Sequence, residues 1–158
     1  MDPATARVPP LAFTDGLGQR HQTDAPGSEP LEVLTLRKDL TTVPAFEFGL
    51  RERVSRLAAF RHPSYGQVRG VSRLGTDASS LALVSDRVTG HRLSDVLAVA
   101  DRNLIPLDIG AGVTLIRQLL DAVASLHEAM PDVCHGAIAL ERIVITPDAR
   151  LVLVEHVL

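Results

Sequence analysis

The sequence predicts an α+β domain in which short strands and amphipathic helices share one chain. Two aliphatic runs of strand length, Ile143–Thr146 and Leu151–Val154, are separated by a proline-containing turn. Two longer segments, Pro44–Arg61 and Leu107–Met130, place apolar residues three and four positions apart, which is the period of a helix with one buried face. With 158 residues and 46% hydrophobic content, the chain is long enough to bury a core.

Composition excludes several classes of function. A net charge of −3 and a pI near 6.0 give no basic field, so we expect no nucleic-acid partner. A single cysteine excludes an internal disulfide and favours a reducing compartment, so we expect a cytoplasmic protein. The start of the chain lacks the apolar core of a signal peptide, and charges interrupt the longest apolar stretches, so we also expect no membrane segment.

The first part of the chain is expected to form little regular structure. Residues 1–30 contain five prolines and three glycines with neither helical nor strand period, which is typical of a flexible arm. A strand is then predicted at Leu31–Leu36. Pro44 stands at the favoured first position of a helix, and His62-Pro63 follows its end. Apolar residues form one face of that helix: Phe46, Leu50, Val54 and Leu57.

The second half of the chain adds two strands and two helices before the closing strand pair. Strands are predicted at Gln67–Leu74 and Leu81–Asp86, joined by a polar turn. A short helix is predicted at Leu93–Ala100. The helix Leu107–Met130 is the longest, and its apolar residues predict a buried stripe: Ile109, Val113, Ile116, Leu120 and Val123.

In this order, the segments resemble a bacterial serine/threonine protein kinase domain. Phe46–Pro63 resembles helix C and the junction after it, Leu83–Gly90 resembles the hinge, and Ser125–Glu128 resembles the run before the catalytic loop. Cys134–Leu158 resembles the catalytic loop and the metal-binding segment. The resemblance covers residues 31–158.

The resemblance implies a domain organisation. Residues 1–30 would be a flexible N-terminal arm, and residues 31–88 a kinase-like small lobe of antiparallel strands with helix C. Residues 89–158 would open the helical large lobe, which suggests that the chain is a fragment of a longer protein.

The resemblance also assigns the family's catalytic positions, and most carry residues of a different chemistry. The strand lysine falls on Leu34, the helix-C glutamate on Arg53 and the catalytic aspartate on Ala137. The metal-binding asparagine falls on Arg142, and the aspartate of D-F-G falls on Glu155. Leucine and alanine cannot hold a phosphate or accept a proton, and one displaced carboxylate makes a poor Mg²⁺ site.

Three sets of residues could in principle supply the missing groups. Gly16–His21 resembles the kinase glycine loop, but His21 stands at its third glycine and no flanking strands are visible, so a plain turn is expected. Arg37 or Lys38 could supply the missing cation, although both are expected to lie in solvent. A further set does not match the spacing of a metal site: His127, Cys134, His135 and His156.

The favoured prediction is a catalytically inactive, kinase-like domain, that is, a pseudokinase, which binds protein partners or regulates them. No catalytic residue, metal or cofactor is expected. If a nucleotide does bind, the resemblance places Ser85 as gatekeeper and Asp86, Val88 and Glu155 as its contacts.

Two alternatives remain open at this point. One is a divergent serine/threonine kinase that transfers phosphate from ATP with Mg²⁺, using Glu155 and a cation from Arg37 or Lys38. The other is an α+β binding module unrelated to kinases, which a missing hinge between Val84 and Gly90 would favour.

Overall fold

The computed structural model describes residues 11–23, 29–75, 79–133, 135–136 and 138–158. These residues form two compact units. The first consists of the described residues up to Arg51 together with Arg69–Arg87, and the second of Glu52–Val68 together with Val88–Leu158.

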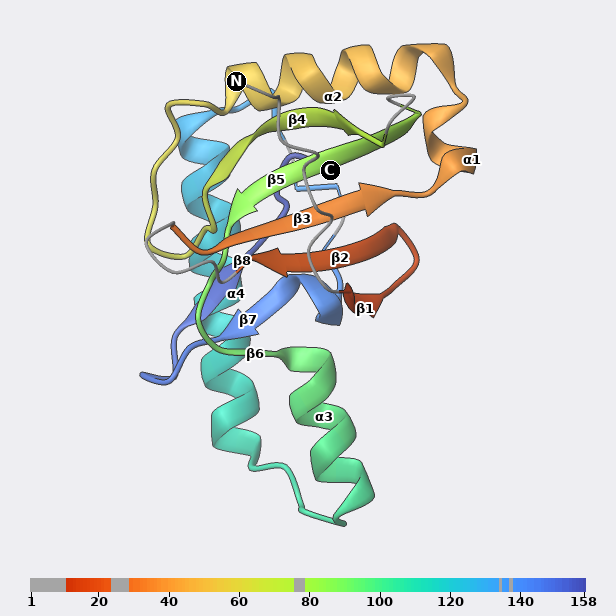
Figure 1. Cartoon of the computed structure of the whole chain (residues 1–158). Helices are drawn as coiled ribbons and strands as arrows, with labels where there is room; N and C mark the ends of the chain where they lie inside the picture. Colours follow the sequence, from red (N-terminus) through yellow and green to blue (C-terminus); the bar gives the residue numbers. More distant parts are fainter. Residues whose placement is uncertain (1–10, 24–28, 76–78, 134, 137) are drawn as a thin grey trace. The chain divides into compact units, whose positions relative to one another are not determined.

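The first unit is built on a five-stranded sheet (Figure 1). Its strands follow the spatial order β1 (Leu11–Thr14), β2 (Gly18–Thr23), β3 (Leu31–Leu36), β5 (Ser80–Asp86) and β4 (Val68–Leu74). β3 is central and pairs antiparallel with both β2 and β5. The α+β class predicted from the sequence is confirmed, and β3 has the predicted bounds.

The core of the first unit lies on one face of β3. Burial alternates along that strand, so that Glu32, Leu34 and Leu36 share the buried face. Leu34 is only 1% exposed and stands opposite Leu83 of β5. After β3 come the short helix α1 (Lys38–Thr41) and the helix α2 (Pro44–Arg56), whose Leu50 is also buried.

The expectation of an arm without regular structure is wrong for residues 11–23. β1 and β2 form an antiparallel hairpin there, and β2 continues into the ladder with β3. Sequence periodicity missed β2 because its sequence, GQRHQT, is polar throughout. Its buried residues are Gly18, Arg20 and His21 instead of aliphatic ones, so the strand lacks the usual apolar signature.

The second unit combines helices with a three-stranded sheet. Its elements are β6 (His91–Arg92), α3 (Leu93–Arg102), α4 (Ile109–Ala129), the 3₁₀ turn η1 (Leu140–Arg142), β7 (Ile143–Ile145) and β8 (Leu151–Leu153). The sheet order is β6-β7-β8, with antiparallel pairing. The strand–turn–strand predicted at the end of the chain is confirmed, with each strand one residue shorter.

One face of α4 is anchored to the rest of the second unit. Ala122 and Leu126 are fully buried, and the Ala122 carbonyl accepts a 2.9 Å hydrogen bond from the Tyr65 hydroxyl. Gln118 accepts a 2.7 Å hydrogen bond from the Leu151 amide at the start of β8. Tyr65 itself bridges to Leu153, so the segment after α2 runs alongside β8.

The apolar stripe predicted to be the buried face of α4 is instead largely exposed. Ile109 is 83% exposed, Ile116 is 59% and Leu120 is 62%. By length and composition alone, α4 is also apolar enough to cross a membrane, which corrects the expectation that charges keep every apolar stretch below span length. Periodicity correctly placed these residues on one face, but it does not say whether that face is covered.

Candidate functional site

The turn between β1 and β2 contains Gly16, and Gly18 begins β2; these are the glycines that resemble a phosphate-binding loop. Its backbone donors are directed at the chain's own carboxylate. One oxygen of Asp15 accepts hydrogen bonds from the amides of Leu17 at 2.8 Å and Gly18 at 3.3 Å. Successive backbone amides of this kind form a cradle for an anion. In this protein the anion in the cradle is Asp15.

The second oxygen of Asp15 faces a buried arginine. Arg20, on β2, is fully buried, and its guanidinium lies 2.5 Å from Asp15. It also lies 4.8 Å from the ring centre of Phe13 and 3.9 Å from the carboxylate of Glu32. Burial acts to raise the pKa of Asp15, but the Leu17 amide and the Arg20 charge outweigh it and hold that pKa below its usual value.

Arg20 also bears on the position that the resemblance gives to the strand lysine. That position is Leu34, and Arg20 is its direct cross-strand partner on β2. A cation is therefore present beside Leu34, although it comes from the neighbouring strand and is neutralised by Asp15. The sequence analysis did not identify Arg20, because it did not predict the strand β2 that carries this residue.

The two cations proposed as replacements lie elsewhere. Arg37 follows the end of β3, is half exposed and pairs with Asp39 at 2.5 Å. Lys38 is exposed at the start of α1. Neither side chain faces the core position of Leu34.

The hinge-like residues occupy the end of β5 and the segment after it. Ser85 is buried and stands opposite Glu32. Asp86 ends the strand, and its carboxylate accepts a 2.5 Å hydrogen bond from Arg69. Val88 is half-buried. The Asp86 side chain is therefore engaged by a neighbouring strand.

A cluster of charged groups lies inside the second unit. Glu155 is 3% exposed, and its carboxylate lies 3.5 Å from the guanidinium of Arg142, which is also buried. Arg53 of α2 reaches the same region, because its guanidinium donates a 3.5 Å hydrogen bond to the His156 carbonyl. The positions that the resemblance gives to the asparagine and the D-F-G aspartate thus form an ion pair, and the position of the helix-C glutamate contacts the backbone one residue further on.

Two buried histidines complete this cluster. Burial lowers the pKa of His135 to about 4, with further lowering from His156, Arg53 and Arg142. Burial and the Arg53 charge lower the pKa of His156 to about 4 as well. Both rings lie near Tyr65, at centroid distances of 6.4 and 5.0 Å. Both histidines are therefore neutral at physiological pH and act as packing groups.

The residues at these positions do not fit a magnesium ion. Mg²⁺ takes oxygen ligands at short distance in octahedral geometry, usually carboxylates together with phosphate oxygens and water. Here one carboxylate is available, it is nearly inaccessible, and it faces the guanidinium of Arg142. No cluster of three or more His, Cys, Asp or Glu side chains that could hold a metal occurs among the described residues.

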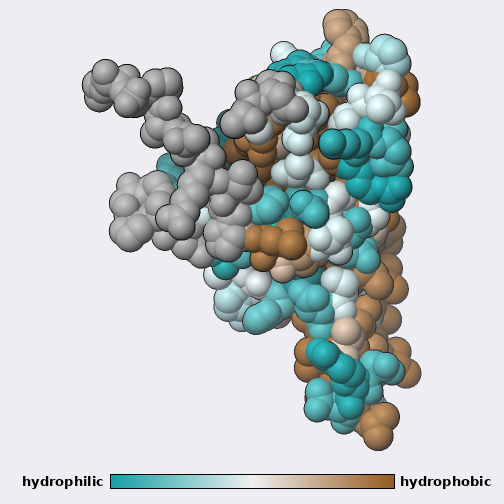
Figure 2. All heavy atoms as spheres, turned by 45° about the vertical axis from the view of Figure 1, so that its right-hand side comes forward, coloured by the Kyte–Doolittle hydropathy of each residue, from teal (hydrophilic) through white to brown (hydrophobic). Residues whose placement is uncertain are grey.

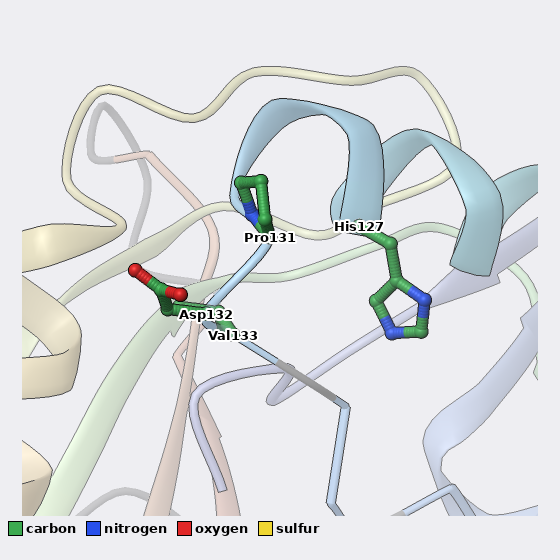
Figure 3. Close-up of a pocket in the computed structure, with 4 residues that line it drawn as sticks. All are labelled: His127, Pro131, Asp132 and Val133. Atoms are coloured by element: carbon green, nitrogen blue, oxygen red, sulfur yellow. The ribbon is translucent and has the colours of Figure 1, made fainter.

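Other candidate residues are dispersed. His127 is exposed near the end of α4, whereas His135 and His156 are buried. His127 lines a hollow of about 460 Å³ together with Pro131, Asp132 and Val133. Figure 3 shows the imidazole of His127 and the carboxylate of Asp132 pointing away from each other, so they do not form an acid–base pair. Cys134 and Ala137 lie outside the described residues.

Comparison with known proteins identifies the fold. No protein-family model and no curated protein matches the sequence. Among solved structures, a Mycobacterium tuberculosis PknI kinase domain double mutant superposes with a TM-score of 0.76 at 18% identity, covering 98% of this chain and 61% of that domain. The maize SIRK1 kinase domain bound to AMP-PNP gives a TM-score of 0.72 at 19% identity, covering 92% of this chain and 49% of that one.

The chain thus spans about half to three-fifths of the solved kinase domains that it matches. At this identity the likeness establishes the fold alone. Over nearly its whole length, this chain has the fold of a protein kinase domain.

Proposed function

We propose that this chain is a pseudokinase domain, which keeps a kinase shape for binding and regulating protein partners and does not transfer phosphate. The observation that carries the proposal is the buried pair of Arg142 and Glu155. The carboxylate at the metal-binding position already has a cation, and that cation is part of the chain.

The energetics of that pair oppose metal binding. A magnesium ion at Glu155 would have to displace Arg142, and it would leave the buried guanidinium of Arg142 without its carboxylate. Removing one partner of a buried ion pair costs on the order of 3–5 kcal/mol. One carboxylate ligand does not offset that cost, because Mg²⁺ gives up its waters reluctantly.

The glycine turn supports the same conclusion from the first unit. A phosphate approaching the amides of Leu17 and Gly18 would meet the carboxylate of Asp15, which is held in its charged form. Two anions competing for the same donors repel each other. In the first unit, therefore, Asp15 occupies the place of a phosphate, and in the second unit Arg142 occupies the place of a metal ion.

A titration of ATP followed by calorimetry, with and without Mg²⁺, tests the proposal. We expect no Mg²⁺-dependent heat for this chain and no phosphate transfer to a protein substrate. The matched control is the double variant Arg142→Asn with Glu155→Asp, which restores the family's residues at both positions. Mg²⁺-dependent binding by the unaltered chain, lost in Glu155→Gln, would contradict the proposal.

One observation favours the second candidate, a divergent kinase. Arg20 brings a guanidinium next to Leu34 and could contact phosphate if Asp15 released it. In that case Arg20→Gln would abolish ATP-dependent phosphate transfer. The ion pair of the fully buried Arg20 with Asp15 favours the inactive domain, because breaking it would leave the buried guanidinium without that carboxylate.

A further inference from the structure

The backbone of the turn between β1 and β2 is bound from two opposite sides. From one side, the Asp15 carboxylate accepts hydrogen bonds from the amides of Leu17 and Gly18. From the other side, the guanidinium of Arg37 donates a 3.2 Å hydrogen bond to the Gly16 carbonyl. The backbone N–H of Arg37 donates a 2.9 Å hydrogen bond to the Leu17 carbonyl. Arg37 therefore binds the carbonyls of the same turn whose amides bind Asp15.

These four hydrogen bonds involve only two peptide groups. In a trans peptide the C=O and the N–H lie in one plane and point in opposite directions, and none of the described peptide bonds is cis. The peptide group between Gly16 and Leu17 donates its N–H to Asp15, and its C=O accepts from the Arg37 guanidinium. The peptide group between Leu17 and Gly18 donates its N–H to the same carboxylate, and its C=O accepts from the Arg37 N–H. Each peptide group is thus held between Asp15 and Arg37.

The register of the sheet brings Arg37 to this turn. Gly18 begins β2 and stands opposite Leu36, the last residue of β3. The next residue along the chain, Arg37, therefore comes beside Leu17. A Cβ added to Gly18 would lie 2.0 Å from the Thr35 carbonyl oxygen, so only glycine lets β2 begin this close to β3. Figure 1 shows the β1–β2 turn and the start of α1 at the same end of the sheet.

Arg37 lies at the surface, whereas the ion pair behind the turn does not. The Arg37 side chain is half exposed, and it donates hydrogen bonds to both carboxylate oxygens of Asp39, at 3.0 and 2.5 Å. Its charge is therefore balanced by the adjacent carboxylate. The Asp15 side chain is only 7% exposed, and Arg20 is fully buried. Figure 2 turns this end of the sheet towards the viewer and shows hydrophilic side chains exposed in the upper part of the view.

We propose that Arg37 is the positioning residue of the glycine turn, which fixes the two peptide groups so that their N–H groups point at Asp15. Hydrogen bonds that follow one another in a chain polarise each other, so each carbonyl contact strengthens the amide contact of the same peptide group. Without the Arg37 contacts the peptide groups are free to rotate away from the carboxylate. Arg37 thus acts on Asp15 through the backbone, from an accessible site on the surface.

This role is different from the cation that Arg37 or Lys38 could supply to a nucleotide. It concerns how the turn is held and does not rest on the proposed function. Nucleotide titration tests the proposed function, whereas amide exchange tests the positioning role, so either can fail alone.

Amide hydrogen exchange followed by NMR tests the role of Arg37, because its guanidinium binds a carbonyl and the measurement reports the N–H of the same peptide group. Arg37→Ala removes the guanidinium contact with Gly16 and keeps the backbone N–H of residue 37. We expect the Leu17 amide to exchange about fivefold faster in Arg37→Ala than in the unaltered chain, and the Gly18 amide to change little. Lys38→Ala is the matched control, since it removes the same charge one residue away and should leave both exchange rates unchanged.

Arg37→Pro separates the two contacts further. Arg37 has a φ of −60° and a ψ of 143°, which proline adopts without strain, and Leu36 before it is in a strand, as the residue before a proline prefers. Proline removes the backbone N–H as well as the guanidinium. The amides of Leu17 and Gly18 should therefore both exchange faster in Arg37→Pro.

An NMR titration of the Asp15 carboxyl group gives a second readout. Amides that no longer point at the carboxylate stabilise its charged form less, so Arg37→Ala should raise the pKa of Asp15 towards its ordinary value. Lys38→Ala should leave that pKa where it is. A role of Arg37 in stability alone would not move the pKa of a side chain that it acts on only through the backbone.

Three results would overturn the proposal. One is an unchanged exchange rate of the Leu17 amide in Arg37→Ala, together with an unchanged pKa of Asp15. Another is an equal effect of Lys38→Ala, because the loss of charge and not of position would then be responsible. The third is an equally faster exchange of the amides of β5, because the substitution would then loosen the whole sheet and not the turn.

Discussion

The hydroxyl of Tyr65 donates a 2.9 Å hydrogen bond to the carbonyl of Ala122, in the inner face of α4. This single contact ties the segment after α2 to the longest helix of the second unit. The same carbonyl also accepts a 2.7 Å hydrogen bond from the Ser125 hydroxyl. Burial raises the pKa of Tyr65 to about 12, which keeps the donor protonated across the physiological range.

Tyr65→Phe should therefore lower the free energy of unfolding by about 1 kcal/mol, since it removes one buried hydrogen bond and keeps the ring. Tyr65→Ala should cost about 3–5 kcal/mol, because it also empties the ring's place among Phe60, His62 and His156. Urea unfolding measures both changes. Equal losses for the two variants would mean that the hydroxyl, and not the ring, dominates.

The two buried histidines predict a loss of stability in weak acid. Their pKa values of about 4 lie below the unfolded value of 6.5, so the unfolded chain binds more protons between these limits. The free energy of unfolding should be fully present above pH 6.5 and should fall as the pH drops towards 4. In this range the unfolded state binds up to about two protons more than the native state.

His156→Phe should roughly halve the steepness of that decline, because one titrating group is removed and an aromatic ring is kept. His127→Gln is the control, since His127 is exposed. Urea unfolding repeated at several pH values gives the two profiles. A His156→Phe profile as steep as that of the unaltered chain would place the titration elsewhere.

The pair of Arg142 and Glu155 predicts strong coupling between two substitutions. Glu155→Gln and Arg142→Met should each destabilise the chain by about 3–5 kcal/mol, because each leaves the other charge buried. The double variant should lose much less than the sum. A double-mutant cycle from urea unfolding gives the coupling energy, and a value near zero would show that the two groups act independently.

Removing the Asp15 carboxylate from the amides of Leu17 and Gly18 should allow the turn to bind an anion from solution. Asp15→Ala removes the acceptor of two backbone amides and the partner of Arg20, so the variant should be less stable by about 1–3 kcal/mol. Inorganic phosphate should then raise the melting temperature of Asp15→Ala more than that of the unaltered chain. Asp39→Ala, at an exposed ion pair, is the matched control. Equal phosphate effects on all three proteins would show that the amides do not form an anion cradle.

Two glycines predict opposite effects of the same substitution. Gly90 has a φ of 147°, and an added Cβ would lie 2.3 Å from the Ile145 carbonyl oxygen, so Gly90→Ala should destabilise the chain by more than 1 kcal/mol, on the order of 2. Gly49 lies within α2 with open space around it, so Gly49→Ala should add about 0.5–1 kcal/mol of stability. Urea unfolding of both variants checks the pair.

Sequence patterns predicted the elements that have apolar periodicity. β3, β5, α2, α4 and the β7–β8 hairpin were all found near their predicted bounds, because each has aliphatic residues at the spacing of its secondary structure. β2 was not found, because the residue at the centre of its buried face is an arginine whose charge is neutralised by Asp15, a residue outside the strand. A pairing between different segments leaves no local period in the sequence.

The site was predictable residue by residue but not as an arrangement. The resemblance identified Arg53, Arg142 and Glu155 as replacements at separate catalytic positions. Their meeting in one buried cluster depends on α2, η1 and the end of the chain converging, which spacing alone does not show. The apolar stripe of α4 illustrates the same limit, since its periodicity is evident in the sequence but its exposure is a property of the fold.

Asp15 has a consequence for how the domain would behave in a cell. If the proposed inactive role holds, a hairpin that supplies its own counter-ion would keep one shape at any nucleotide concentration. The domain would then present the same surfaces during starvation and growth.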